Sequence, residues 1–194
     1  YSSAASDVYK RQVVQHPRLK NNIRPMSRIA ENLCRIRAEV PHGVELVAVS
    51  KFHPVEALRE AYDAGQRVFG ESRVNELVAK AATLPGDIRW HFIGHLQTNK
   101  VKQVVGKVAL IQSVGSLPLL EAVEKEAEKQ DIVQDILLEV NIGGEEAKSG
   151  FAPAQLEDAA RAAQAMSHVR VRGLMTIPPA DSDRDTNIRY FQEV

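Results

Sequence analysis

Apolar positions along the chain follow two different periods, and segments with the two periods alternate. Apolar residues spaced three and four apart, as in the segment after Pro25, predict an amphipathic helix with one buried stripe. The stripe of this first helix consists of Met26, Ile29, Leu33, Ile36 and Val40. The next segment, 45–50, is rich in valine and apolar on both faces, as expected of a strand covered on both sides in a parallel sheet.

The same alternation of strand and helix continues along the chain. Short apolar runs predict strands, and longer stretches with a helical period predict the helices between them. The predicted strands are 45–50, 67–70, 88–94, 109–114, 135–142 and 169–177. The predicted helices that follow them are 54–64, 71–84, 97–108, 117–130, 153–166 and a last one that contains Ile188 and Phe191. Such alternation indicates right-handed crossovers and an α/β fold with a parallel sheet.

Six strand–helix units leave two architectures open. One is an open doubly wound sheet, and the other is a (β/α)₈ TIM-type barrel that is truncated after about six strands. No G-x-G-x-x-G motif follows the first predicted strand, and a helix precedes that strand; both features favour the barrel. In either architecture, functional groups gather at the carboxyl ends of the strands.

The two ends of the sequence differ from its middle. Residues 1–22 show no sustained period of either kind, so we expect a disordered or extraneous leader, part of which resembles translated adapter sequence. The last predicted helix reaches Val194 without a cap or turn. We therefore expect one barrel domain over 23–194 that is incomplete at its carboxyl-terminal end.

Composition narrows the class of protein. The 194 residues include 25 Lys and Arg and 25 Asp and Glu, so the formal net charge is zero, and no clustered basic patch of the kind that binds nucleic acid is present. The single cysteine, Cys34, excludes an intramolecular disulfide, which fits a reducing compartment. No segment approaches the ~18 apolar residues of a membrane span, and no signal segment opens the chain. These features predict a cytoplasmic protein without nucleic-acid or membrane partners.

The first predicted strand ends on Ser50 and Lys51, and this lysine has two interpretations. A lysine at a strand end often keeps its ammonium in water while its carbon chain covers apolar surface. Alternatively, Lys51 is an amine nucleophile of the kind that forms a Schiff base with an aldehyde cofactor. The other strand ends form a polar rim whose glycines and short side chains leave room for a ring-shaped cofactor. This rim consists of Gly70 to Ser72, Gly94 to Gln97, Ser113, Asn141, Met175 and Thr176.

Five blocks of sequence, in order, resemble the pyridoxal phosphate homeostasis protein family. They are VAVSKFHP (47–54), VFGESRVNE (68–76), RWHFIGHLQTNK (89–100), LLEVNIGGEEAKSGF (137–151) and VRGLMTIP (171–178). The resemblance implies a barrel similar to the amino-terminal domain of alanine racemases. It also implies that pyridoxal 5'-phosphate (PLP) is held as a Schiff base on the lysine of the VSK block, here Lys51. With the polar rim, it makes His91, Ser113, Asn141 and Met175 further candidate cofactor-binding residues.

The resemblance implies one physical requirement for Lys51, and this sequence departs from the family pattern at three points. A Schiff base requires an unprotonated amine, so we expect Lys51 to be buried at the barrel mouth, where the neutral form is favoured. Ser72 stands where the family usually has asparagine, and Gly115 stands where aspartate is common. The family's serine- and glycine-rich phosphate-binding segments would lie beyond Val194.

Several of these residues also have structural interpretations. His91 is typical of a core histidine whose hydrogen bonds are satisfied. His91 and His95 lie four residues apart, but a metal site needs a third ligand that no nearby cluster supplies, so we expect no metal. Lys148 and Ser149 match the family signature but can also order the loop before the next helix, with Ser149 near its cap.

Three functions remain open. The first is a monomeric PLP carrier without catalytic residues, which buffers intracellular PLP and exchanges it with amino acids or apo-enzymes at Lys51. The second is a PLP-dependent amino-acid racemase, which needs acid/base groups on both faces of the substrate carbon; alanine racemase-like enzymes take one of them from a second β-domain that this sequence does not show. The third is a metal-dependent barrel hydrolase, which the few strand-end carboxylates disfavour.

Overall fold

The computed structural model describes residues 26–145, 148–179 and 183–193. Six strands form one parallel sheet in the order β1-β2-β3-β4-β5-β6, so each strand lies next to its neighbour in sequence. The strands are β1 (Ala48–Val49), β2 (Val68–Glu71), β3 (Arg89–Phe92), β4 (Leu110–Val114), β5 (Gln134–Val140) and β6 (Val169–Thr176). The α-helices are α1 (Arg28–Glu39), α2 (Val55–Asp63), α3 (Val74–Thr83), α4 (Leu117–Lys129), α5 (Leu156–Gln164) and α6 (Arg184–Glu193), and the 3-10 helices are η1 (Thr98–Gln103) and η2 (Pro153–Gln155).

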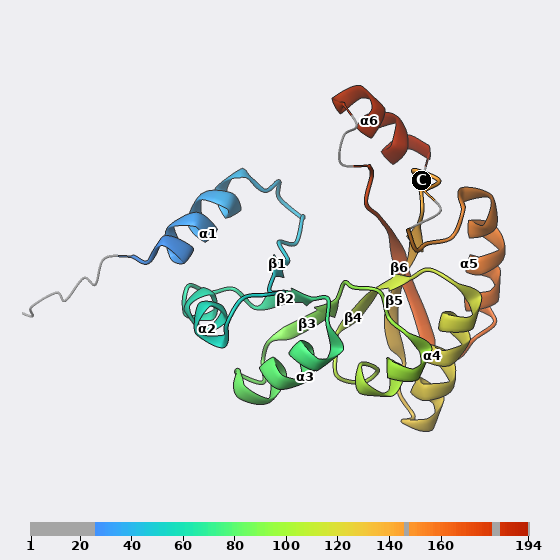
Figure 1. The fold of residues 1–194 in the computed structure, drawn as a ribbon, viewed down its shortest axis with the longest axis horizontal. Helices are drawn as coiled ribbons and strands as arrows, with labels where there is room; N and C mark the ends of the chain where they lie inside the picture. Colours follow the sequence, from blue (N-terminus) through green and yellow to red (C-terminus); the bar gives the residue numbers. More distant parts are fainter. Residues whose placement is uncertain (1–25, 146–147, 180–182, 194) are drawn as a thin grey trace, which may run out of the picture.

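The sheet is curved and open (Figure 1). Within the described residues, β1 and β6 each pair with a single strand, so the two edges do not meet. This arrangement confirms the predicted barrel architecture that stops after six strands. Apolar side chains on both edge strands are consequently exposed: Val49 on β1 is 50% exposed and Leu174 on β6 is 37% exposed.

The two faces of the sheet differ in burial. In β5, Ile136, Leu138 and Val140 are buried, whereas the alternate residues Leu137 and Glu139 are only half-buried. A strand with this period-2 pattern has one face against a packed layer and one face that is less covered. Helices α4 and α5 supply the packed layer, since both contact β5 and β6. The less covered face is the one that lines the interior of the incomplete barrel.

One continuous hydrophobic core holds the sheet to its helices. Phe69 of β2 and Trp90 of β3 are register partners, and their ring centroids lie 5.8 Å apart in a tilted arrangement. Both rings are at least 95% buried, and burial of each such side chain stabilises the fold by roughly 1.5–3 kcal/mol. Helix α4 adds Leu120 and Val123, both fully buried. This core fixes the carboxyl ends of the strands relative to one another.

Local signals place the helix ends. Ser27 caps α1 by accepting a hydrogen bond from the Ala30 amide at 3.2 Å, and Ser116 caps α4 through the Leu119 amide at 3.4 Å. Gly65 follows α2 with a φ of +89°, a left-handed conformation that favours glycine after a helix. Ser116 therefore ends the connection after β4, and Gly65 turns the chain from α2 toward β2.

Two predicted elements differ from the structure. The predicted strand over 45–50 is regular only at Ala48–Val49, the two residues that pair with β2. The predicted helix over 97–108 is the 3-10 helix η1, which ends before Gly106, a residue with a φ of +76°. The predicted leader, 1–22, lies outside the described residues.

Helix α6 is the last element of the described residues. Helix α6 forms where a helix is predicted, but its apolar residues Ile188 and Phe191 are 44% and 61% exposed. None of the helices in the described part of the chain combines the length and the apolar character that crossing a bilayer requires.

Candidate functional site

Lys51 lies in a tight turn at the carboxyl end of β1. The turn is closed by a hydrogen bond from the His53 amide to the Ser50 carbonyl at 3.1 Å, and Phe52 has a φ of +64°, which is rare for a residue with a Cβ. The Lys51 side chain is exposed. Its Nζ has no hydrogen-bond or ion-pair partner among the described residues, so no neighbouring side chain occupies this amine.

The exposure of Lys51 corrects one prediction. Burial of this lysine at the barrel mouth was expected, but β1 is an edge strand, and no other strand of the described residues covers the turn. The prediction that Lys51 stands at the carboxyl end of the first strand is confirmed, since β1 ends at Val49, two residues before it.

A buried charged cluster lies directly beneath this turn, and the sequence analysis did not anticipate it. Glu71, the last residue of β2, is completely buried, and Lys80 of α3 is 5% exposed. The Lys80 ammonium donates to Glu71 Oε2 at 2.7 Å, to Glu76 Oε2 at 2.8 Å and to the Ser50 carbonyl at 2.8 Å. We call Glu71, Glu76 and Lys80 the α3 ion cluster.

The opposite charges of the α3 ion cluster stabilise one another. Burial acts to lower the pKa of Lys80, but its hydrogen bonds to Glu71 and Glu76 and their charges outweigh burial and raise the pKa above its ordinary value. The hydrogen bond from Lys80 in turn lowers the pKa of Glu76. The ammonium and carboxylate therefore stay charged at neutral pH. A buried pair of this kind is tolerated only when its hydrogen bonds are satisfied.

His91 lies near the carboxyl end of β3 and is 3% exposed. Its Nδ1 lies 2.9 Å from Gln112 Nε2, so Nδ1 accepts the amide hydrogen and the ring proton resides on Nε2. Burial lowers the pKa of His91 and favours the neutral ring. Both features match the structural interpretation of His91 as a satisfied core histidine.

Ser113 of β4 is buried, and its hydroxyl donates to the Gly94 carbonyl at 2.5 Å. It lines a groove of about 460 Å³ at the carboxyl ends of β4 and β5, together with Glu139, His95 and Ser149. His95 Nδ1 and Ser149 Oγ lie 2.8 Å apart. Burial raises the pKa of Glu139, and the nearby charge of His95 opposes this rise only in part. We call this hollow the β4–β5 groove.

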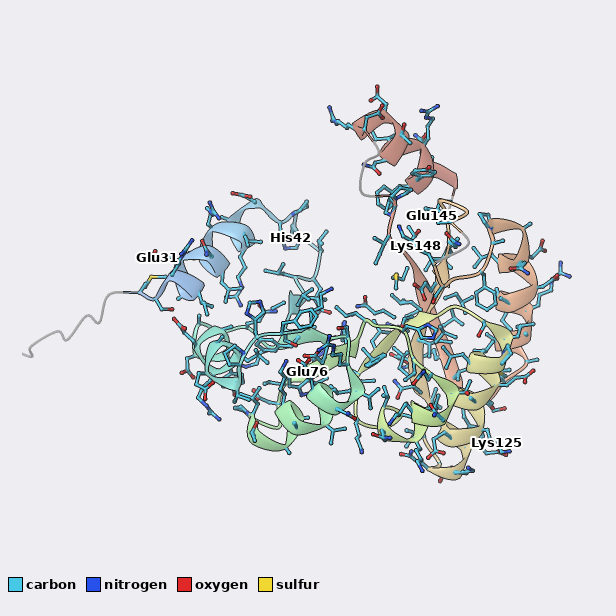
Figure 2. All side chains as sticks on the ribbon, in the orientation of Figure 1. Glu31, His42, Glu76, Lys125, Glu145 and Lys148 are labelled. Carbon is cyan, nitrogen blue, oxygen red and sulfur yellow. The ribbon has the colours of Figure 1, made fainter. Side chains whose placement is uncertain are left out.

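The remaining two candidate residues lie on or after the last two strands. Asn141 follows β5, and its Nδ2 donates to the Glu145 carbonyl at 2.9 Å. Met175 of β6 is half-buried and pairs in register with Glu139. Glu145 also forms an ion pair with Lys148 at 2.6 Å, and Figure 2 shows the two labelled side chains close together. Lys148 thus has an exposed ion-pair partner in Glu145, which is compatible with the structural interpretation of Lys148.

The structure places all five candidate residues toward the carboxyl edge of the sheet, but on different strands. Lys51 follows one edge strand and Met175 lies on the other, and His91, Ser113 and Asn141 belong to the strands between them. Close packing at this edge is shown by Gly94, where a Cβ would lie 2.1 Å from the Ser72 carbonyl oxygen. Nowhere in the described ranges do three or more His, Cys, Asp or Glu side chains group as they would around a metal ion.

Comparison with known proteins gives a consistent result. The sequence profile of the family described as "Alanine racemase, N-terminal domain" matches residues 25–194. The pyridoxal phosphate homeostasis protein of Aquifex aeolicus is 41% identical over 173 residues, which cover 87% of this chain and 76% of that protein. The protein of the same name from Escherichia coli is 34% identical over 181 residues, which cover 86% and 76%.

Solved structures agree with the sequence comparison. PipY of Synechococcus elongatus without PLP superposes with a TM-score of 0.80 at 39% identity, over 84% of this chain and 77% of PipY. PipY with PLP bound gives a TM-score of 0.76 at 38% identity, over 84% and 76%. An alanine racemase of Clostridium difficile shares the fold, with a TM-score of 0.72 at 12% identity over 85% of this chain and 44% of the racemase.

Proposed function

The chain belongs to the pyridoxal phosphate homeostasis protein family, and we propose on this premise that it binds PLP and takes part in the intracellular homeostasis of this cofactor. The related PipY structure with PLP bound supports cofactor binding. The observation that carries the proposal is the free amine of Lys51, exposed and unpaired among the described residues at the carboxyl end of β1. This edge is where parallel α/β folds place their ligands.

Lys51 is the residue that would hold the cofactor. PLP supplies an aldehyde, which condenses with a primary amine: the C=N bond forms, the C=O bond breaks, and the oxygen leaves as water. The surroundings of Lys51 fit a flat aromatic ring, because Val49 and Phe52 beside it are 50% and 66% exposed and offer apolar surface. His91, Ser113, Asn141 and Met175 are proposed as further contacts along the same edge of the sheet.

We assign the protein the role of a carrier without turnover. A racemase needs a proton donor and a proton acceptor on opposite faces of the substrate carbon. Tyr62 does not meet this need, because its hydroxyl donates to Asp87 Oδ1 at 2.7 Å, next to the amino end of β3. Tyr190 belongs to α6 and not to a strand end. Incoming amino acids or apo-enzymes would receive PLP by exchange of the imine, with the protein acting as a cytoplasmic monomer.

Absorbance spectroscopy tests the proposal. The purified protein titrated with PLP is expected to develop the visible band of a lysine-bound cofactor, and Lys51→Ala is expected to abolish it. Lys129→Ala is a matched control, because Lys129 is exposed and pairs only with Glu126 on the surface of α4. An unchanged band in Lys51→Ala would overturn the assignment of this residue.

A second assay separates the carrier from the racemase. Exchange of the α-proton of L-alanine with solvent deuterium is followed in the presence of PLP. A carrier is expected to show no exchange above that of free PLP. Robust exchange that Lys51→Ala abolishes would establish the enzyme instead.

A further inference from the structure

We propose that helix α3 acts as a clamp that positions Lys51, with Lys80 as the positioning residue that joins its parts. The clamp consists of Arg73 and the α3 ion cluster. This inference rests on the proposed function, because it concerns how the cofactor-binding amine is presented. The residues of the clamp form hydrogen bonds with the residue before Lys51 and with the residue after it. Both sets of contacts depend on the buried ammonium of Lys80.

The residue before Lys51 is held by its backbone and its side chain. The Ser50 amide donates to the Gly70 carbonyl at 2.8 Å, and the Ser50 hydroxyl lies 2.9 Å from Glu71 Oε2. The Ser50 carbonyl accepts from the Lys80 ammonium at 2.8 Å. Ser50 is 2% exposed, so these hydrogen bonds form away from water and resist exchange with it.

The residue after Lys51 is held from the first turn of α3. The Phe52 amide donates to Glu76 Oε2 at 3.3 Å, and the Arg73 guanidinium stacks on the Phe52 ring at 4.3 Å from its centroid. Phe52 adopts a left-handed backbone with a φ of +64°, a conformation that is unfavourable for a residue with a Cβ and persists only when its surroundings impose it. Glu76 and Arg73 supply that constraint.

Lys80 connects the contacts on the two sides of Lys51. Its ammonium contacts both carboxylates, Glu71 beneath Ser50 and Glu76 beneath Phe52, as well as the Ser50 carbonyl itself. Without this cation, the buried carboxylate of Glu71 would face the half-buried carboxylate of Glu76, and mutual repulsion would separate them. Glu76 would then no longer hold the Phe52 amide. The turn that carries Lys51 is therefore preformed before the cofactor arrives, which reduces the ordering cost of binding.

Hydrogen–deuterium exchange on the cofactor-free protein tests the clamp without any use of PLP. In wild type, the amides of Phe52 and His53 are expected to be protected by Glu76 and by Ser50. In Lys80→Met, exchange of both amides is expected to accelerate by about tenfold or more, because tenfold corresponds to the loss of a single modest interaction. The matched control is Val123→Ala, which removes buried volume from α4 and lowers stability without a change near Lys51. If Val123→Ala accelerates these amides as much as Lys80→Met does, Lys80 acts on global stability and the clamp is refuted.

The closing experiment measures PLP affinity in the same variants. Lys80→Met is expected to weaken PLP binding by about tenfold, while the mass of a reduced adduct still maps to Lys51. Glu76→Gln, which keeps one acceptor oxygen and removes the charge, is expected to show a smaller loss in the same direction and provides the test if Lys80→Met does not fold. Unchanged affinity in both variants refutes the clamp but leaves the proposed function intact. Failure of the wild type to bind PLP refutes the proposed function itself.

Discussion

The carboxyl edge of the sheet contains two regions that differ in how they are held. At the β1–β2 end, the turn around Lys51 rests on the α3 ion cluster, in which Glu71 and Lys80 are buried, Glu76 is half-buried and the charges satisfy one another. At the β4–β5 end, the groove is bounded by neutral hydrogen bonds, such as that of Ser113, and by exposed groups such as His95. Buried charges allow few alternative arrangements, because each broken contact leaves a desolvated charge. Neutral contacts at an exposed rim allow more.

The difference indicates that the two regions have different roles. The Lys51 amine is exposed. The backbone before it is held by the buried Lys80, and the backbone after it is held by the half-buried Glu76. The β4–β5 groove can adapt to different occupants at its rim, because His95 and Ser149 are exposed and can exchange their mutual contact for water. Rigid presentation of the amine and an adaptable rim fit the proposed carrier role, in which the cofactor would be held and passed to different acceptors.

The largest effect is expected for Lys80→Met. Removal of the ammonium leaves Glu71 buried without its cation, and breaking a buried ion pair in this way costs about 3–5 kcal/mol of unfolding free energy. Urea unfolding followed by circular dichroism measures the loss. Lys129→Met is the control: its ion pair with Glu126 is exposed, so its effect is expected to stay within about 0.5 kcal/mol. Equal effects of the two substitutions would show that burial of the cluster is not what fixes the β1–β2 end.

A smaller effect is expected for Ser113→Ala at the other end. This substitution removes the hydroxyl that donates to the Gly94 carbonyl, a neutral hydrogen bond worth about 1 kcal/mol. The same urea unfolding assay measures it. A loss as large as that of Lys80→Met would remove the contrast between the two regions.

The effect of Glu139→Gln is expected to depend on pH. Burial holds the pKa of Glu139 above its ordinary range in the folded protein, so the folded state binds this proton more tightly than the unfolded state. The stability that this group contributes is complete below the unfolded pKa of about 4.3 and is lost as pH rises through the folded pKa. Glutamine stays neutral throughout.

Glu139→Gln is therefore expected to be more stable than wild type at about pH 8, with the difference shrinking toward about pH 4. Urea unfolding at both pH values measures this difference. A stability difference that does not change between the two pH values would show that the carboxyl of Glu139 is not desolvated at the rim.

The smallest effect is expected for His95→Ala. His95 is exposed, and its contact with Ser149 at 2.8 Å competes with water. The change in unfolding free energy is expected to be below about 0.5 kcal/mol. Thermal unfolding of the two proteins side by side measures it, and a loss well above this limit would show that the rim is more rigid than its exposure indicates.

The periodic pattern predicted most of the fold, and its failures have physical causes. Spacings of three and four placed α4, whose apolar residues face the core. They also placed α1, but of its predicted buried stripe only Leu33 is buried, while Met26 and Ile36 are 56% and 38% exposed. Strand β1 is shorter than its apolar pattern, because a regular strand extends only as far as its pairing and β1 pairs with β2 at two positions alone. The stretch after Gln97 forms η1, since the turns there close with bonds such as that of the Val104 amide to the Val101 carbonyl, at 2.9 Å.

The site was predictable only in part. Lys51 was found because a lysine ends an apolar strand and falls in a family block. Lys80 was missed because an apolar-stripe analysis of 71–84 places Val78 inward and a lysine outward, whereas Val78 is 38% exposed and Lys80 only 5%. The rotation of α3 is decided by Glu71, which lies nine residues earlier in sequence and binds Lys80 across the strand–helix interface. No local pattern contains such a contact.

The central claim is that the amine of Lys51 holds the cofactor, and mass mapping tests it most directly. The protein is incubated with PLP, reduced with borohydride, digested and analysed by mass spectrometry. The account predicts a phosphopyridoxyl group on the peptide that contains Lys51, in one equivalent per chain. An adduct on another lysine in preference to Lys51, or no adduct at all, would contradict it.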